Sequence, residues 1–168
     1  MLGFFPVWVL GVVDYHGSRV VALEPIVWPS ALEIVRVMSS AFAKCGIPER
    51  VLTDRGSVFR SELFESMLAG RGVKHTLTRP CHPWTNGRIE RVFRTFKETL
   101  GNYFWLLRSR DQVGRVCRDF VVFYNAHRPH SSFGGRTPDE VHAGRDACTG
   151  HLGELVLFDG RMHWWRFS

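Results

Sequence analysis

The chain has 168 residues, of which 45% are hydrophobic and 23% are charged. This length supports one folded domain with a small addition, and the composition excludes a disordered or fibrous protein. Positive charge is concentrated in residues 71–110, where nine Lys or Arg accompany two Glu, whereas the rest of the chain has 13 basic and 14 acidic residues. That concentration predicts a polyanionic partner, although a basic surface kept for solubility would give the same pattern.

The N-terminal apolar residues and the cysteines indicate the cellular compartment in which the protein is expected. Residues 1–13 are too few to cross a bilayer and carry no cationic leader, so we expect a buried strand, no membrane partner and a cytoplasmic location. The cysteines are widely separated and form no Cys-x-x-Cys pair, which argues against a zinc site and favours free thiols in a reducing compartment. They are Cys45, Cys81, Cys117 and Cys148.

The first third of the chain predicts a hairpin and a helix. Val7–Asp14 is a valine-rich run typical of a strand covered on both faces, and Arg19–Pro25 is its expected antiparallel partner. Ser30, with Glu33 three residues later, predicts the start of a helix that ends at Gly46. The apolar residues expected to face inward from this helix are Leu32, Val35, Met38, Ala41 and Phe42.

The middle of the chain alternates strands and helices. Arg50–Asp54 and Val73–Thr78 are predicted strands. Ser61 can cap the helix between them, whose expected inward residues are Leu63, Phe64, Met67 and Leu68. Asp111 can cap a later helix that carries Val113, Val116, Cys117, Phe120, Val121 and Tyr124. The order predicts a mixed α/β fold.

The stretch His82–Lys97 predicts the helix on which the functional argument depends. Pro83 and Asn86–Gly87 supply chemistry typical of a helix start. An apolar stripe then follows at helical spacing, formed by Ile89, Val92, Phe93, Phe96 and Leu100. Glu90, Arg94 and Lys97 share another face, at i, i+4 and i+7. In an average helix such a face would be a solvated stripe with a Glu–Arg pair.

A second acid gives Glu90 a possible partner. Asp54 ends an apolar strand and is followed by a glycine turn, and 35 residues separate it from Glu90. An acid at a strand end and an acid on a helix, brought together by the fold, are what binding of divalent cations requires.

Three ordered motifs resemble the catalytic core shared by retroviral integrases and bacterial insertion-sequence transposases, the Asp-Asp-Glu family. The first two are Asp54-Arg55-Gly56-Ser57 and, after the 35-residue gap, Pro83 with Asn86–Glu90. The third runs from Tyr124-Asn125 through Arg128-Pro129-His130-Ser131 to Gly135–Glu140. The resemblance implies a ribonuclease-H-like mixed sheet flanked by helices, with a partial core in residues 1–144 and a linker and β-hairpin in residues 145–168.

The resemblance also implies chemistry and partners. In such a core, Asp54 and Glu90 would bind Mg²⁺ or Mn²⁺ for cleavage and joining of DNA strands, and a two-metal site is expected only in the complete core. Arg94 and Lys97 match positions that contact a DNA end, and Arg88 and Arg91 are further candidates for phosphate contacts. DNA is the expected partner, and self-association into a homo-oligomer is expected. Tyr124, Asn125, Arg128 and His130 are interpreted as a structural lock under the site.

One family element has no counterpart. The family's first acid lies on an opening strand, whereas Asp14 falls in Val13–Arg19, which resembles the turn of the hairpin after it. Residues 1–6 contain no acid, so we expect the chain to begin after that strand. The absence of a central strand predicts a gap or distorted pairing between Val7–Asp14 and Val51–Asp54, or a partner strand from another chain.

Three functional hypotheses remain open from sequence. One is a transposase or integrase core with weak metal affinity, because only Asp54 and Glu90 are assigned. A second is a catalytically dead remnant that binds DNA or pairs with a transposase. A third is a ribonuclease-H-like nuclease that cuts without joining, which the motifs at Asn86–Glu90 and Tyr124–Glu140 disfavour.

Overall fold

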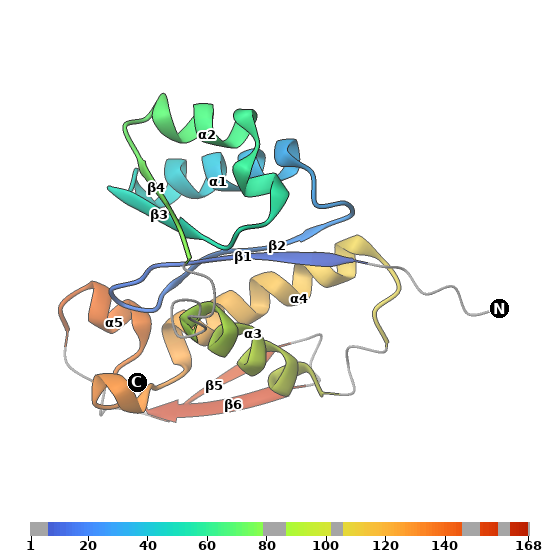
Figure 1. Cartoon of the computed structure of the whole chain (residues 1–168). Helices are drawn as coiled ribbons and strands as arrows, with labels where there is room; N and C mark the ends of the chain where they lie inside the picture. Colours follow the sequence, from blue (N-terminus) through green and yellow to red (C-terminus); the bar gives the residue numbers. More distant parts are fainter. Residues whose placement is uncertain (1–6, 79–86, 102–105, 146–151, 158–161, 168) are drawn as a thin grey trace.

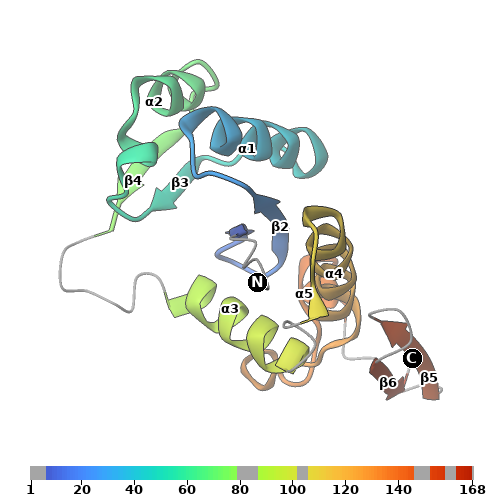
Figure 2. The same cartoon turned by 90° about the vertical axis from the view of Figure 1, so that its right-hand side faces the viewer.

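The computed structural model describes residues 7–78, 87–101 and 106–145, and two further strands within 152–167 (Figure 1). Figure 2 shows two helical layers, with α1 and α2 on one side of the β1–β2 hairpin and α3 and α4 on the other. The elements in chain order are β1 (Trp8–Val13), β2 (Val20–Ile26), α1 (Ala31–Cys45), β3 (Arg50–Thr53), α2 (Glu62–Ala69), β4 (Lys74–Leu77), α3 (Gly87–Leu100), α4 (Arg110–Val122), α5 (Pro138–His142), β5 (Leu152–Leu157) and β6 (Met162–Phe167).

The valine-rich strand β1 contributes to both layers, as its sequence predicted. It pairs antiparallel with β2 and contributes Leu10 and Val12 to the apolar cluster under α1 and α2. Val9 and Val13 pack against the cluster formed with α3 and α4. This division follows from the alternation of side chains along a strand.

Gly11 lets α3 lie directly on the backbone of β1. A Cβ atom at this position would come within 2.8 Å of Ile89 Cδ1 and 3.1 Å of Phe93 Cζ. The missing side chain therefore sets how closely the N-terminal half of α3 approaches the strand.

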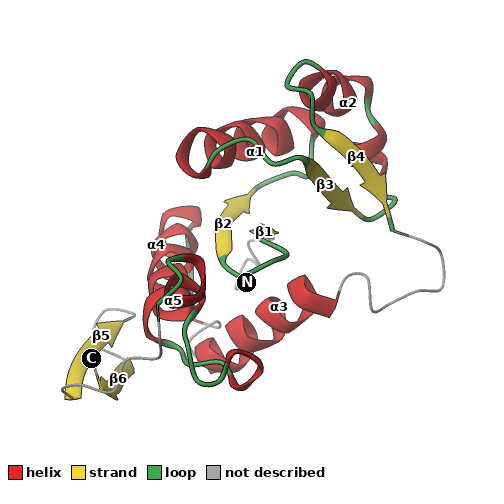
Figure 3. Ribbon diagram, turned by 90° about the vertical axis from the view of Figure 1, so that its left-hand side faces the viewer, coloured by secondary structure: helices red, strands yellow, loops and turns green. Residues whose placement is uncertain are grey.

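The predicted gap between the first strand and the Asp54 strand is confirmed. In the described part of the chain, β1 pairs with β2 and β3 pairs in parallel with β4, in two separate sheets. Figure 3 shows the two strand pairs apart, with β3 and β4 under α1 and α2. A mixed α/β architecture results, in which a cleft replaces the hydrogen bonds that would join the pairs.

Helix caps follow the sequence with one exception. Ser30 accepts a hydrogen bond from the Glu33 N–H, and Ser61 accepts one from the Phe64 N–H, as predicted. The cap of α4 is Ser109 rather than Asp111, which lies in the first turn. Both residue types cap helices, and two candidates two residues apart leave the start ambiguous.

Two residues expected to face inward are exposed. Leu32 is 69% exposed and Leu63 is 47% exposed, whereas Ile34 and Val37 are buried in α1. Ile34 and Phe64 lie in the same first helical turns and are buried, so Leu32 and Leu63 are exposed because they lie on the outer sides of their helices. The remaining inward prediction for α2, namely Phe64, Met67 and Leu68, is confirmed.

The C-terminal hairpin is confirmed as an antiparallel pair, β5 with β6, in which Leu152 is opposite Phe167. Residues 146–151 and 158–161, which fall within the predicted linker and hairpin, lie outside the described residues. In the part of the chain that is described, no helix has both the length and the apolar character needed to cross a membrane.

Candidate functional site

Asp54 lies immediately after β3, where the chain turns away from the sheet. Its Oδ1 atom accepts a hydrogen bond from the Gly56 N–H at 2.8 Å, and the side chain is exposed. This turn leaves the exposed carboxylate at the strand end, as the sequence predicted.

A hydrogen-bonded relay not predicted from the sequence supports that turn. His75 on β4 contacts Glu65 Oε1 through Nδ1 at 2.7 Å and the Thr53 hydroxyl through Nε2 at 2.8 Å. The Thr53 hydroxyl in turn donates to the Asp54 carbonyl at 2.9 Å. Arg55 completes the support by donating to the Thr78 carbonyl at 3.1 Å. The backbone around Asp54 is therefore held from α2 and β4.

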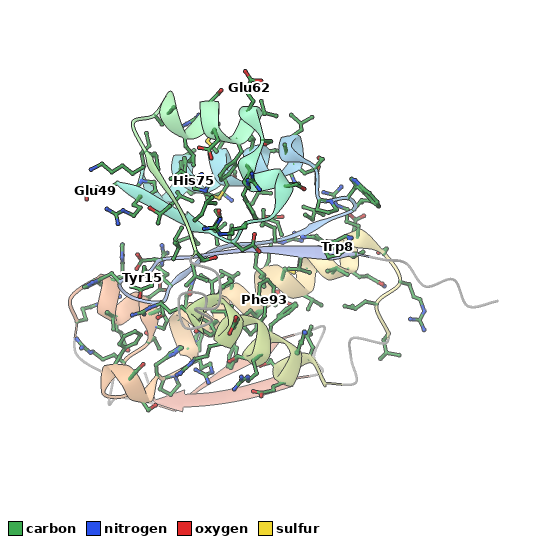
Figure 4. The ribbon with its side chains drawn as sticks, in the orientation of Figure 1. Trp8, Tyr15, Glu49, Glu62, His75 and Phe93 are labelled. Carbon is green, nitrogen blue, oxygen red and sulfur yellow. The ribbon has the colours of Figure 1, made fainter. Side chains whose placement is uncertain are left out.

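The N-terminal end of α3 is fixed to the tip of the β1–β2 hairpin. Arg88 donates to the Ser18 hydroxyl at 2.6 Å, and its guanidinium carbon lies 4.4 Å from the centre of the Tyr15 ring. Figure 4 labels Tyr15 at the hairpin tip and Phe93 on α3 below β1. Arg88, a predicted phosphate contact, thus has a role in positioning α3.

Asp54 and the start of α3 open onto one cleft of about 790 Å³. Its lining includes Asp54, Arg88 and Ile89, together with the residues of β1 from Val9 onward. Glu90 is the next residue along α3 and its side chain is exposed. The cleft therefore brings the Asp54 turn and the first turn of the Glu90 helix to one region of the molecule.

The predicted basic face of α3 is on the surface. Val92, Phe96 and Leu100 are buried, whereas the opposite side carries exposed polar residues. Those exposed residues include Glu90, Arg91, Arg94 and Lys97. Pro83 and Asn86, which were expected to shape the entry to this helix, lie outside the described residues.

Asp14, the alternative first acid, closes the hairpin turn. Its Oδ2 atom accepts from the Gly17 N–H at 2.7 Å and its Oδ1 atom from the His16 N–H at 3.2 Å. This is the turn position that the sequence indicated for Asp14. Within residues 7–78, 87–101 and 106–145, no three acidic, His or Cys side chains form a group suited to hold a metal ion.

The predicted structural lock is confirmed by its contacts. Asn125, in a π-helical turn at Phe123–His127, donates to the Val20 carbonyl and accepts from the Val20 N–H, both at 2.8 Å. Tyr124 and His130 are buried, with ring centres 4.8 Å apart. The lock fastens the chain after α4 to the start of β2.

The end of the third motif is fastened in the same region. Thr137 and Glu140 form a reciprocal capping box at the start of α5. Asp139 accepts from Arg19 Nε at 2.7 Å, which links α5 to the β1–β2 hairpin. The hydrogen bond to Asp139 raises the pKa of Arg19, so the guanidinium of this ion pair remains protonated. The third motif therefore fixes the β1–β2 hairpin, which carries Ser18 and Tyr15, the two residues that Arg88 contacts.

His130 is expected to make stability depend on pH. Burial and the neighbouring Arg128 guanidinium lower the pKa of His130 from 6.5 to about 4. Between those values the unfolded chain binds the extra proton, so acidification destabilises the fold by about 2 kcal/mol from pH 7 to pH 5. Urea unfolding of the wild type and of His130→Phe at both pH values measures this.

His130→Phe keeps an aromatic ring against Tyr124 but cannot titrate. The stability that the substitution itself costs should be the same at both pH values. The difference in free energy of unfolding between the wild type and His130→Phe should therefore be smaller at pH 5 than at pH 7. Equal pH dependence in the two proteins would show that other groups cause it.

Comparisons with known proteins agree with the described fold. The model of the "Integrase core domain" family matches residues 71–138, and that of the "TnsB C-terminal domain" matches residues 27–103. The insertion element IS476 39.2 kDa protein of Xanthomonas euvesicatoria is 33% identical over 114 residues, covering 68% of this chain and 33% of the relative. The Pol polyprotein of radiation murine leukemia virus (strain Kaplan) is 29% identical over 106 residues, covering 63% of this chain and 18% of the relative. The chain thus spans a third or less of these relatives.

Solved integrase structures share the fold. The catalytic core domain of BIV integrase superposes with a TM-score of 0.67 at 21% identity, covering 82% of this chain and 86% of that one. The HTLV-2 integrase catalytic core domain in complex with magnesium, in a trimeric form, gives a TM-score of 0.63 at 18% identity, covering 81% of this chain and 93% of that one. These matches confirm the predicted ribonuclease-H-like fold.

Proposed function

Because this chain belongs to the family of integrase and transposase catalytic cores, we propose that it binds DNA and cleaves and joins DNA strands with a divalent cation. Asp54 and Glu90 are the proposed catalytic carboxylates. The observation that carries the proposal is the common cleft, which is lined by Asp54 and by the first turn of the helix that bears Glu90.

The residues present suit Mg²⁺ or Mn²⁺ in a weak, partly hydrated site. Carboxylate oxygens are the ligands that these cations prefer, and Mg²⁺ is often held by one or two carboxylates with waters and substrate phosphates completing its shell. When bound, the cation would activate a water or a DNA 3′-hydroxyl and stabilise the leaving oxygen of the phosphodiester. The chain's own part is to fix the Asp54 turn through Thr53 and His75 and to fix the start of α3 through Arg88.

The exposed basic face of α3 is the proposed DNA contact. Arg91, Arg94 and Lys97 can neutralise backbone phosphates, which releases counterions and makes affinity depend on salt. Self-association on DNA, as a homo-oligomer, is part of the proposal. It is supported by the trimeric form named for the HTLV-2 core and by the fold match to the simian T-cell lymphotropic virus intasome (TM-score 0.68, 17% identity, covering 95% of this chain and 65% of that one).

A second candidate is a DNA-binding protein without catalysis, which could pair with an active transposase. It is favoured by the described residues offering two assigned carboxylates and no group of three metal ligands. An assay of plasmid nicking and oligonucleotide strand transfer with Mg²⁺ or Mn²⁺ separates the two candidates. Metal-dependent strand transfer supports the first, and DNA binding without nicking supports the second.

The double substitution Arg94→Ala with Lys97→Ala is expected to weaken DNA binding by about tenfold at low salt. It should also reduce the slope of log affinity against log salt by roughly two, because two phosphate contacts are lost. Fluorescence anisotropy with a labelled duplex at several salt concentrations measures both. Lys44→Ala, at an exposed position on α1, is the matched control and should change neither quantity. An unchanged slope in the double variant would exclude this face of α3.

A further inference from the structure

A second pocket lies where β2 meets α1 and α4. Its volume is about 410 Å³, and among the described residues it shares no lining residue with the cleft beside Asp54. In Figure 2 the arrowhead of β2 lies between α1 and α4. The volume falls in the range of sites for small molecules.

Arginine dominates the charged lining of this pocket. The lining contains four arginines and two acids, and these are Arg36, Arg110, Arg115, Arg118, Glu24 and Asp111. The excess of positive charge attracts an anion, whereas the two acids would repel an extended polyanion such as DNA that lay across them. The ligand that suits this lining is therefore a compact anion.

Internal contacts hold two of these arginines in place. Arg110 donates to the Pro25 carbonyl through Nε at 3.2 Å and to Glu33 Oε2 through Nη2 at 3.3 Å. Arg36 Nε lies 3.7 Å from the other oxygen of the same carboxylate. One carboxylate cannot neutralise two guanidinium groups, so positive charge remains in a fixed arrangement at the pocket.

Arg115 and Arg118 are the arginines available to a ligand. Both are exposed, and within the described parts of the chain neither makes a hydrogen bond or an ion pair. They are three residues apart on α4, so their side chains lie on the same side of the helix. A guanidinium presents its donors as a planar fork that matches the oxygens of a phosphate group.

Gly114 leaves open space in the pocket beside Arg118. It is buried in the interior of α4, where glycine is less favourable than alanine. A Cβ atom added there would lie 3.4 Å from Arg118 Nη1 and 3.6 Å from Pro25 Cγ, which are ordinary contact distances. Packing alone would therefore accept alanine, and what glycine adds is room inside the pocket.

We propose that this pocket binds a compact phosphate-bearing anion, of which pyrophosphate and the triphosphate group of a nucleotide are examples. Arg115 and Arg118 contact the phosphate oxygens, and Arg36 and Arg110 add fixed positive charge. An anion with more than one negative charge is favoured over a monocarboxylate because four guanidinium groups line the pocket. The site goes beyond the proposed DNA chemistry and does not depend on Asp54, Glu90 or α3.

Titration of the whole chain with inorganic pyrophosphate, in the absence of divalent cations, tests the proposal. Isothermal titration calorimetry should give saturable binding at one site per chain. Acetate should bind roughly tenfold more weakly or worse, because it carries a single charge. The double substitution Arg115→Gln with Arg118→Gln should also weaken pyrophosphate binding by roughly tenfold or more, since both phosphate contacts are lost.

Arg91→Gln with Arg94→Gln is the matched control, because it removes two exposed arginines at the same spacing from α3. It should leave pyrophosphate binding unchanged and weaken the binding of a labelled DNA duplex, whereas the double variant of α4 should do the reverse. If the α3 variant bound DNA normally, the proposed DNA face would fail while the phosphate pocket could still stand on its own titration.

Gly114→Ala tests the pocket without changing its charge. The substitution should raise the melting temperature, because alanine favours a helix interior. It should nevertheless weaken pyrophosphate binding by roughly threefold or more, because the methyl group occupies space beside Arg118. A variant that merely folded poorly would lose both stability and binding, so the opposite signs identify a local effect.

Three kinds of result would overturn the proposal. Absence of saturable binding, or equal weakening by the two double variants, would leave only non-specific attraction to a basic protein. Unchanged pyrophosphate affinity in Gly114→Ala or in the double variant of α4 would place the bound anion elsewhere. DNA binding that falls as much in the α4 variant as in the α3 variant would assign Arg115 and Arg118 to a DNA surface.

Discussion

Glu90→Gln is expected to lower metal-dependent DNA nicking by about 100-fold or more, which corresponds to about 2.7 kcal/mol of transition-state stabilisation. The substitution keeps the size of an exposed side chain on α3 and removes only its charge. A neutral amide binds Mg²⁺ or Mn²⁺ far more weakly than a carboxylate. Single-turnover nicking of supercoiled plasmid with Mn²⁺ measures the loss, and unfolding of the variant should match that of the wild type. Asp54→Asn should act in the same way.

Glu98→Gln is the matched control, because Glu98 is also an exposed acid on α3, eight residues further along. It should leave the nicking rate unchanged. Asp14→Asn should also leave it unchanged, because asparagine has the same size and its amide oxygen can still accept the shorter of the two turn hydrogen bonds, the one from the Gly17 N–H. Loss of nicking in Asp14→Asn would instead assign Asp14 as the missing acid, and full activity in Glu90→Gln would remove the proposed catalytic pair.

The elements that were predicted well are those whose signals are local. The spacing of Val92, Phe96 and Leu100 alone places one face of α3 against the core, and the structure buries all three. Errors arose where two local solutions were equally good, as with Ser109 and Asp111 at the start of α4. The first turn of α1 shows another limit, because Leu32 and Ile34 are both apolar and lie on opposite sides of the helix, and composition alone does not say that Ile34 is the buried one.

The supports of the candidate site required the fold itself. His75 reaches Thr53 only because β3 and β4 pair in parallel in the observed register, and nothing in either strand specifies that register alone. Arg88 was predicted to contact phosphate from its charge and its place on α3, but its contacts to Ser18 and Tyr15 span some 70 residues of sequence. Sequence could therefore propose Asp54 and Glu90 but could not identify what holds them.

Asn125→Ala is expected to destabilise the protein by about 3 kcal/mol. Asn125 is buried and makes both the hydrogen bond to the Val20 N–H and the one to the Val20 carbonyl, and Val20 is 1% exposed. Alanine would leave both buried backbone groups without their partner, and each such group costs about 1–3 kcal/mol. This is a large part of the 5–15 kcal/mol by which domains are usually stable. Urea unfolding followed by circular dichroism at pH 7 measures the loss.

Asn125→Asp separates lost hydrogen bonding from lost volume, because the two side chains are nearly the same size. An ionised carboxylate can still accept from the Val20 N–H, but its second oxygen would face the Val20 carbonyl and repel it. At low pH a protonated carboxyl can donate to that carbonyl again, so the deficit relative to wild type should shrink as pH falls. Referring each value to wild type at the same pH removes the separate effect of His130. Two results would contradict this role for the paired hydrogen bonds to Val20. One is a loss of less than about 1 kcal/mol in Asn125→Ala. The other is a loss of stability in Asn125→Asp, relative to wild type, that does not change with pH.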